Sequence, residues 1–451
     1  MNPQDEKFIK MTQSPVGRLI CSLAVPCIIS MLVTSFYNMA DTYFVGMLKS
    51  NAATGAVGVV FSMMSVIQAV GFFFGQGSGV YISRCLGRQD YGEASSMAAT
   101  GFASSLLTGL LICIFGQIFL EPLAYLLGST DTILPYTKDY LRIILLGAPW
   151  MATSLVLNNQ LRFQGSASYA MVGIVTGAVI NIVLDPLLMF GLNLGIAGAG
   201  WATIISQFIS FCILYAVCAK GSNIPISLKN VRLKWFYFSQ MFQGGLPSLS
   251  RQILASFATI CLNNAARAYG DTAIAAVGVV QRIMFFGAST MLGFGQGFQP
   301  VCGINFGARL YDRVKEGFWF CVKYSTIFLV LIGAGGAIFA PQLIALFRDD
   351  PAVVEFGTAA LRFQCMTFWV QGWIVMSNMM QQSTGQTLPA TFNSVARQGL
   401  FFIPAVLILP IFLGETGIQV AQSVADIATF CVALPMQLYI LKKLQRGELK
   451  R

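Results

Sequence analysis

Three aspartates stand out among the ionisable residues because they lie well inside long apolar stretches: Asp41, Asp185 and Asp426. A charged side chain at membrane depth costs about 3 kcal/mol or more, so such acids are expected to be paired or functional. Carboxylate oxygens can coordinate a hard cation such as Na⁺, or bind a proton where burial and mutual repulsion disfavour the charged form. The chain contains no histidine, so carboxylates are the natural groups for proton coupling.

Two of these acids belong to the N-terminal half of the chain. Asp41 lies late in the first apolar stretch (YNMADTYFVG) and Asp185 late in the fifth (NIVLDPLLMFG), so both are predicted in the outer half of the membrane. Asn181 precedes Asp185 by one helical turn and shares its face. A structural alternative is that Asp41 caps a helix and that Asp185, before Pro186, is a turn residue. The positions 220 residues later carry no acid, whereas a structural cap would be expected in both halves.

The C-terminal half has its own candidate polar site around Asp426. Gln422 lies one turn before Asp426, so the two share a helix face. Arg282 and Arg397 are set into apolar stretches of the same half, and each could pair with Asp426 or with backbone carbonyls. The alternative is that Asp426 only joins two helices by a hydrogen bond. Arg251 is expected to extend to the inner membrane surface.

The elements that carry these residues are long apolar stretches. Hydrophobic residues make up 56% of the 451 residues and charged residues 10%, against roughly 25% charged in soluble domains. Stretches of about 20 apolar residues can cross the hydrocarbon core as helices. We therefore predict an all-α polytopic membrane protein with twelve transmembrane helices, near residues 17–44, 53–80, 93–119, 134–160, 168–190, 196–219, 240–266, 272–301, 315–340, 356–380, 388–412 and 417–441.

The basic residues determine the predicted orientation. Most lie in the segments that are intracellular if both termini are cytoplasmic, including the linker 220–239 and the tail from Lys442. This bias follows the positive-inside rule, and it accounts for the net charge of +10 without a nucleic-acid partner. The 11 cysteines lie mostly in apolar stretches and include no CxxC pair, which favours packing over disulfides or metal binding.

The two halves of the chain repeat one another. AVGVV at 56–60 recurs at 276–280, and FGQG at 74–77 recurs at 294–297, both with an offset of 220. Because each half has six spans, the halves are expected to be parallel repeats with a cavity between them. The predicted domains are an N-terminal bundle (1–219), a cytoplasmic linker (220–239) and a C-terminal bundle (240–451). The GQG blocks lack a neighbouring Lys-Ser/Thr, so they indicate close helix packing rather than phosphate binding.

Over its whole length the chain resembles the multidrug and toxic compound extrusion (MATE) transporters, most closely their DinF/MepA-like prokaryotic branch. The features that carry the resemblance are Pro26 with FYNMADTYFVG, NIVLDP in the fifth span, GWATIISQ in the sixth and the duplicated FGQG. The resemblance implies two pseudo-symmetric six-helix bundles arranged in a V, in the cytoplasmic (inner) membrane of a bacterium. It also implies export of cationic, lipophilic drugs or dyes in exchange for H⁺ or Na⁺.

The same resemblance implies a cation or proton site in the first bundle. The residues of matching type in this chain are Asp41, Tyr140, Asn158, Asn181, Asp185 and Thr203. A bound Na⁺ would be held by Asp41, Asn181, Asp185 and Thr203. In the mechanism proposed for the family, occupation of this site bends the first helix at Pro26 and expels the drug.

Two alternatives remain at this level. A flippase for a lipid-linked saccharide would share the architecture, but an anionic pyrophosphate would require several basic residues, and only Arg282 and Arg397 are candidates. An integral-membrane enzyme would require a catalytic cluster at the membrane surface, and the sequence contains no such motif. We therefore expect a transporter, not an enzyme, that needs no cofactor beyond H⁺ or Na⁺ and functions as a monomer.

Overall fold

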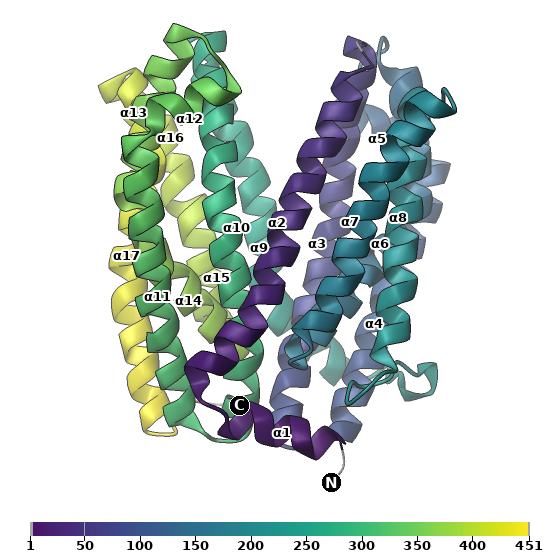
Figure 1. Cartoon of the computed structure of the whole chain (residues 1–451), viewed down its shortest axis with the longest axis vertical. Helices are drawn as coiled ribbons and strands as arrows, with labels where there is room; N and C mark the ends of the chain where they lie inside the picture. The colour runs from purple at the N-terminus through teal and green to yellow at the C-terminus, as the bar shows by residue number, and fades with distance from the viewer. Residues whose placement is uncertain (1–2, 49, 450–451) are drawn as a thin grey trace. The chain divides into compact units, whose positions relative to one another are not determined.

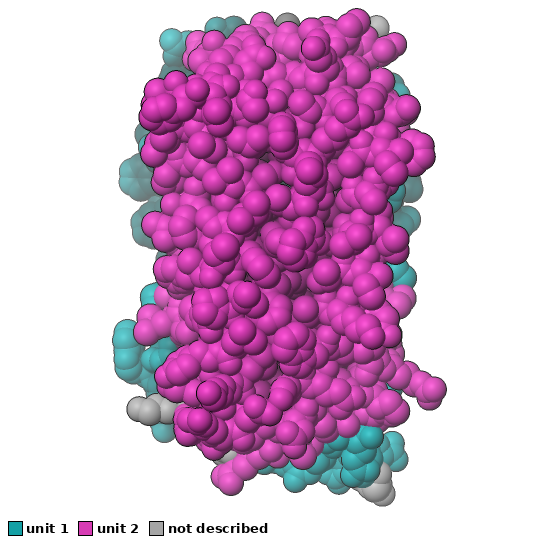
Figure 2. Space-filling model, turned by 90° about the vertical axis from the view of Figure 1, so that its left-hand side faces the viewer, with its two compact units in different colours: residues 1–13, 29–245 teal, residues 14–28, 246–451 magenta. Residues whose placement is uncertain are grey.

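The chain folds into helices, most of them joined by short loops; the longest connection, residues 219–234, lies between α8 (Gly195–Cys218) and α9 (Trp235–Arg267) (Figure 1). The structure is a computed structural model that describes residues 3–48 and 50–449, and these residues contain no strand. They divide into two compact units: Met1–Gln13 with Ile29–Gly245, and Ser14–Ile28 with Leu246–Arg451. We call these unit 1 and unit 2; Figure 2 shows one face of unit 2 in magenta.

Unit 1 consists of long helices and of short helices in the connections between them. They are α1 (Pro3–Gln13), the second part of α2 (Val16–Gly46), α3 (Asn51–Gly87), α4 (Tyr91–Ile118), α5 (Leu120–Leu126), α6 (Leu134–Phe163), α7 (Ala167–Pro186), the π-helix η1 (Leu187–Gly191), α8 (Gly195–Cys218), the 3₁₀ turn η2 (Leu228–Asn230) and the beginning of α9 (Trp235–Arg267).

The helices of unit 2 repeat this order with more interruptions. They are the beginning of α2, most of α9, α10 (Asp271–Gly307), α11 (Tyr311–Ile338), α12 (Ala340–Phe347), α13 (Pro351–Thr367), α14 (Val370–Ser383), α15 (Thr387–Val395), the π-helix η3 (Ala396–Phe401), α16 (Phe402–Leu413) and α17 (Glu415–Gln445).

The number of membrane crossings follows from helix length and composition. Ten helices of the described chain are long and apolar enough to cross a bilayer. The predicted seventh span is α9, which has 33 residues but is made more polar by groups such as Arg251 and Asn263. The predicted tenth span is divided between α13, which ends at Thr367, and α14, which begins at Val370. With these two the twelve-helix fold is confirmed.

The outer and inner faces of the helices differ in residue size, as expected in lipid. In α4 the large residues Leu107, Phe115 and Ile118 are more than half exposed, whereas Ala98 and Ala99 are fully buried. Small residues inside let helices approach closely, and large apolar residues outside face the acyl chains. A Cβ added at Gly109 would lie only 2.6 Å from Cα of Pro149 in α6. Helix packing therefore depends on small residues.

The repeated GQG blocks confirm this packing prediction. Gly77 in α3 lies directly against the backbone of Met241 in α9, within unit 1. At the repeated position in α10, a Cβ on Gly297 would lie 2.5 Å from Cα of Ala24 in α2, within unit 2. Each GQG helix thus packs on the beginning of the first helix of the other repeat.

Prolines lie where the chain passes between the units. In α2 the boundary follows Ile28, two residues after Pro26, and in α9 it precedes Leu246, directly before Pro247. A proline inside a helix removes one backbone hydrogen bond and permits bending. Pro26 was already evident as a hinge candidate in the sequence, whereas Pro247 becomes evident only from the division into units.

Candidate functional site

The two acids of unit 1 are held at depth by α2 and α7. Asp185 is fully buried, and Asp41 is half-buried with a buried Oδ1 atom. The Oδ1 atoms of both have no hydrogen-bond partner among the described residues. The two carboxylates are close enough to repel each other electrostatically. An unpartnered buried carboxylate oxygen is costly, so this pair is suited to an ion or proton that the protein itself does not provide.

Asn181 and Thr203 complete one side of the site. With its amide oriented to satisfy both neighbours, Asn181 donates from Nδ2 to Asp185 Oδ2 at 3.0 Å and accepts from the Thr203 backbone N–H at 3.3 Å. The Thr203 hydroxyl donates to the Ala199 carbonyl at 3.0 Å, so its oxygen can still accept or coordinate. Asn181 therefore fixes Asp185 through one oxygen and leaves the other free.

Two tyrosines line the same region. Tyr140 is fully buried in α6, and its hydroxyl has no hydrogen-bond partner among the described residues. Tyr37 lies one turn before Asp41 in α2, and both tyrosines interact electrostatically with Asp41 and Asp185. Tyr37 was not among the residues predicted from the sequence, although its spacing of four residues from Asp41 places both on one helix face.

A cavity of about 100 Å³ adjoins this cluster. Tyr37, Asn158 and Asn181 are among its lining residues, which are neutral throughout. The Asn158 amide donates to the Ala170 carbonyl at 3.0 Å and joins α6 to α7. Pockets for drug-sized ligands usually measure about 300–1,000 Å³, so this cavity has room only for a few water molecules or a small ion.

The site of unit 1 thus brings together Asp41, Tyr140, Asn181, Asp185 and Thr203, with Asn158 on the wall of the adjoining cavity. The atoms that could coordinate an ion are carboxylate, amide and hydroxyl oxygens. Hard cations prefer oxygen ligands, and a desolvated carboxylate pair also favours protonation. The geometry is compatible with either a proton or Na⁺.

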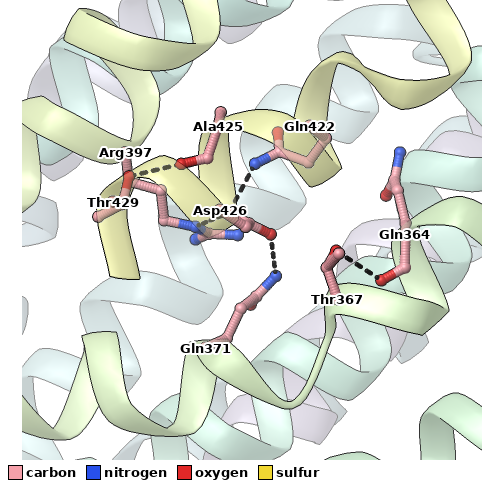
Figure 3. Close-up of polar contacts among 8 residues, drawn as sticks. All are labelled: Gln364, Thr367, Gln371, Arg397, Gln422, Ala425, Asp426 and Thr429. Atoms are coloured by element: carbon pink, nitrogen blue, oxygen red, sulfur yellow. Dashed lines mark hydrogen bonds and ion pairs between the residues drawn. The ribbon is translucent and has the colours of Figure 1, made fainter. Parts of the chain in front are cut away.

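The acid of unit 2 has a different environment (Figure 3). Asp426 in α17 is buried, and its Oδ1 accepts from Arg397 Nε at 2.8 Å and from Gln422 Nε2 at 3.0 Å. Its Oδ2 accepts from Gln371 Nε2 at 3.0 Å. Arg397 reaches Asp426 from the π-helix η3. Asp426 is therefore neutralised and hydrogen-bonded through both oxygens.

Two other arginines of unit 2 are not part of this ion pair. Arg282 is exposed and makes no hydrogen bond or ion pair with any described residue, so it does not join the cluster. Arg251, expected at the inner surface, is partly buried and lines a cavity of about 360 Å³ together with Arg397 and Gln422.

The twelve-helix fold and the polar site at depth define the class of the protein: a multi-pass membrane transporter. The family model described as MatE matches residues 26–187 and 247–408, so the chain belongs to the MatE family. The two matched segments are offset by 221 residues (247 − 26 and 408 − 187), which confirms the internal duplication.

Named relatives agree with this assignment. The chain is 29% identical to the multidrug export protein MepA of Staphylococcus haemolyticus (strain JCSC1435) over 439 residues, covering 96% of this chain and 95% of that protein. It is 28% identical to MepA of Staphylococcus aureus (strain NCTC 8325 / PS 47), covering 95% of this chain and 96% of that protein.

Solved structures show the same fold. An outward-facing multidrug resistance MATE transporter of the MOP superfamily superposes with a TM-score of 0.92 at 24% identity, covering 97% of this chain and 98% of that chain. A MATE structure in the straight conformation gives a TM-score of 0.91 at 25% identity, covering 97% of this chain and 99% of that chain.

Proposed function

We propose that the protein is a secondary antiporter that exports cationic, lipophilic drugs or dyes from the bacterial cytoplasm in exchange for H⁺ or Na⁺. It would lie in the cytoplasmic membrane with both termini inside and work as a monomer. The MepA relatives are named as multidrug export proteins, which supports the direction and the breadth of the substrate class. No cofactor other than the coupling ion enters this proposal.

The observation that carries the proposal is the pair of unpartnered carboxylate oxygens in unit 1. Asp41 and Asp185 repel each other, and each has a buried oxygen without a donor. A proton or Na⁺ would remove this cost, with Asn181, Thr203 and the Tyr140 hydroxyl completing the oxygen shell. The adjoining cavity of about 100 Å³ provides room for such an ion and its water.

Pro26 is the proposed hinge. It lies two residues before the point in α2 where the chain passes from unit 2 to unit 1. Asp41 lies further along the same helix, in unit 1. Ion binding at Asp41 could therefore be transmitted through one continuous helix to a place where that helix can bend. Alternating access by such a movement is our proposed mechanism.

The flippase alternative is less well supported. A lipid-linked pyrophosphate carries more than one negative charge, which would require several uncompensated cations along its path. In unit 2 the cavity has two arginines in its lining, and one of them is paired with Asp426. The acids of unit 1 would repel a polyanion.

Dye efflux from proteoliposomes tests the proposal, with H⁺ and Na⁺ gradients imposed separately. The wild-type protein should export a cationic dye under at least one gradient. Asp41→Asn should lower this export at least about tenfold, because a charge-assisted contact to the ion is lost. Asp185→Asn should weaken the dependence of export on the ion.

The control is Asp349→Asn, in the connection between α12 and α13, because Asp349 lies outside every helix and outside both cavities. It should export at the wild-type rate. Unchanged export by Asp41→Asn at equal protein level would remove the carboxylate pair from the mechanism.

A further inference from the structure

The cavity in unit 2 differs from that in unit 1 in size and in charge. It measures about 360 Å³, which is within the usual range for small-molecule sites. Its lining includes two guanidinium groups, those of Arg251 and Arg397, and no aspartate or glutamate. The wall also contains amide side chains, such as those of Gln252, Gln281 and Asn393, together with apolar residues.

Arg251 lacks a counter-ion. It is partly buried in α9 and makes no hydrogen bond or ion pair with any described residue. Its charge is close enough to that of Arg397 for the two groups to repel each other. A guanidinium at membrane depth is costly unless it is paired, so an anionic ligand at this position would stabilise the protein.

Arg397 is only partly used by its partner. It donates to Asp426 Oδ1 through Nε at 2.8 Å, and no described residue accepts from its two terminal nitrogens. Asp426 does not itself line the cavity. Asp426 therefore neutralises Arg397 from outside the lining and leaves its two terminal nitrogens without an acceptor, while Arg251 contributes one uncompensated positive charge. When Asp426 is counted together with Arg397, one net positive charge remains at the cavity, which suits a monoanion.

The local fold places Arg397 in this position. η3 is a π-helix of six residues between α15 and α16, and the extra residue of a π-turn changes the direction of the side chains that follow. Such turns frequently occur at functional sites. Here the turn joins Arg397 to Asp426 on α17 and keeps both Arg397 and Gln398 on the cavity wall.

We propose that the cavity of unit 2 binds the carboxylate of an amphiphilic aromatic monoanion or zwitterion, with Arg251 as its counter-ion and Arg397 as a second donor. Apolar wall residues such as Met284 and Phe285 would receive the aromatic part. A guanidinium fork recognises a planar carboxylate through parallel hydrogen bonds. The transported class would then include carboxylate-bearing compounds; this extension to transport rests on the proposed antiport function, whereas binding itself does not.

Equilibrium binding to the purified full-length protein tests the proposal, with radiolabelled 1-naphthoate as probe and the neutral 1-naphthamide as its matched analogue. The wild-type protein should bind naphthoate at least about tenfold more tightly than naphthamide, because charged hydrogen bonds are the stronger ones. Arg251→Gln should abolish this preference and leave naphthamide binding unchanged. Arg282→Gln, an exposed arginine of the same unit without a partner, should retain the preference.

Equal affinity of the wild-type protein for naphthoate and naphthamide would overturn the proposal, as would an unchanged preference in Arg251→Gln. Should Arg251→Gln fail to fold, the wild-type comparison still decides. Arg251→Lys then provides a second variant, which should lower the preference several-fold because the planar fork is lost. Binding is measured without an ion gradient, and Asp41→Asn should bind naphthoate like the wild type, so failure of the antiport proposal is recognised separately.

Discussion

The buried ion pair between Arg397 and Asp426 allows a quantitative prediction of the stability lost in the Asp426→Asn variant. Asp426→Asn retains the shape of the side chain but removes the negative charge that faces Arg397 at 2.8 Å. The neighbouring contacts can adjust: Gln371 donates to Oδ2 from Nε2, while its own Oε1 is buried without a partner, so rotation of that amide would let it accept from the new Asn. The loss is therefore concentrated at Arg397.

The magnitude follows from the exposure of the two partners. Breaking a fully buried pair costs about 3–5 kcal/mol, because an uncompensated charge remains. The side chain of Asp426 is only 2% exposed but that of Arg397 is 23% exposed, so we expect the lower end, about 3 kcal/mol. For a unit of this size, 1 kcal/mol corresponds to roughly 2–4 °C in Tm, which gives a decrease of about 6–12 °C.

Thermal unfolding of the purified protein in detergent is the assay. Glu415→Gln is the control, since Glu415 is an exposed acid in the same helix, and its Tm should change by less than about 2 °C. The double variant Asp426→Asn/Arg397→Gln removes both charges and should recover at least half of the loss. A Tm for Asp426→Asn equal to that of the control, or additive losses in the double variant, would refute a stabilising ion pair at this position.

Two further predictions concern the helix contacts. Gly297→Ala should lower the free energy of unfolding by about 1–3 kcal/mol, because the new Cβ would lie 2.5 Å from Cα of Ala24; Gly335→Ala has free space and is the control, and equal stability of the two in a thermal scan would contradict this packing. Lys7, in α1 outside the candidate spans, donates to Ser166 Oγ at 2.6 Å and to Asn223 Oδ1 at 3.0 Å, and burial lowers its pKa from 10.5 to about 8. When α1 is detached from Ser166 and Asn223, Lys7 binds more protons between pH 8 and 10.5 than when α1 is packed against them. The packing of α1 should therefore become more stable as pH rises through that window and stay constant below it. Hydrogen-exchange protection of α1 measures this, and a Lys7→Met variant that retains the same pH dependence would contradict it.

Much of the fold could be predicted from the sequence because a bilayer imposes strong constraints on length and polarity. The twelve apolar stretches correspond to twelve crossings. The ends of α3 and α10 could not be predicted: they continue to Gly87 and Gly307, past the expected ends at 80 and 301. Hydropathy falls where a helix leaves the membrane, but the backbone hydrogen bonds continue for as long as neighbouring helices support them.

The interruptions of the helices were also beyond sequence reasoning. The break between Thr367 and Val370, and the π-turns η1 and η3, carry no distinctive residue pattern. They nevertheless decide which side chains meet. Arg282 and Arg397 were equal candidates for pairing with Asp426. In the structure Arg397 contacts Asp426 from the π-helix η3, whereas Arg282 in α10 is exposed.

The candidate site of unit 1 was more accessible to sequence reasoning than that of unit 2. Asp41 and Asp185 are unusual at any membrane depth, and the family resemblance pointed to their neighbours. Tyr37 could have been added from its spacing of four residues before Asp41. The free guanidinium of Arg251 could not, because a basic residue near a span end usually extends to the surface, and only the packed bundle shows that it lines a cavity.

The duplication also bears on how the two units divide their roles. Both halves descend from one six-helix pattern, yet their buried charges are arranged in opposite senses. In unit 1 two acids have unpartnered oxygens beside a small neutral cavity; in unit 2 the acid is neutralised and an arginine without a partner faces a larger one. A positive ion is stabilised only in the first environment, and an anionic group only in the second. Ion coupling can therefore belong to one unit alone, which is consistent with the absence of an acid at the positions in the second repeat that correspond to Asp41 and Asp185.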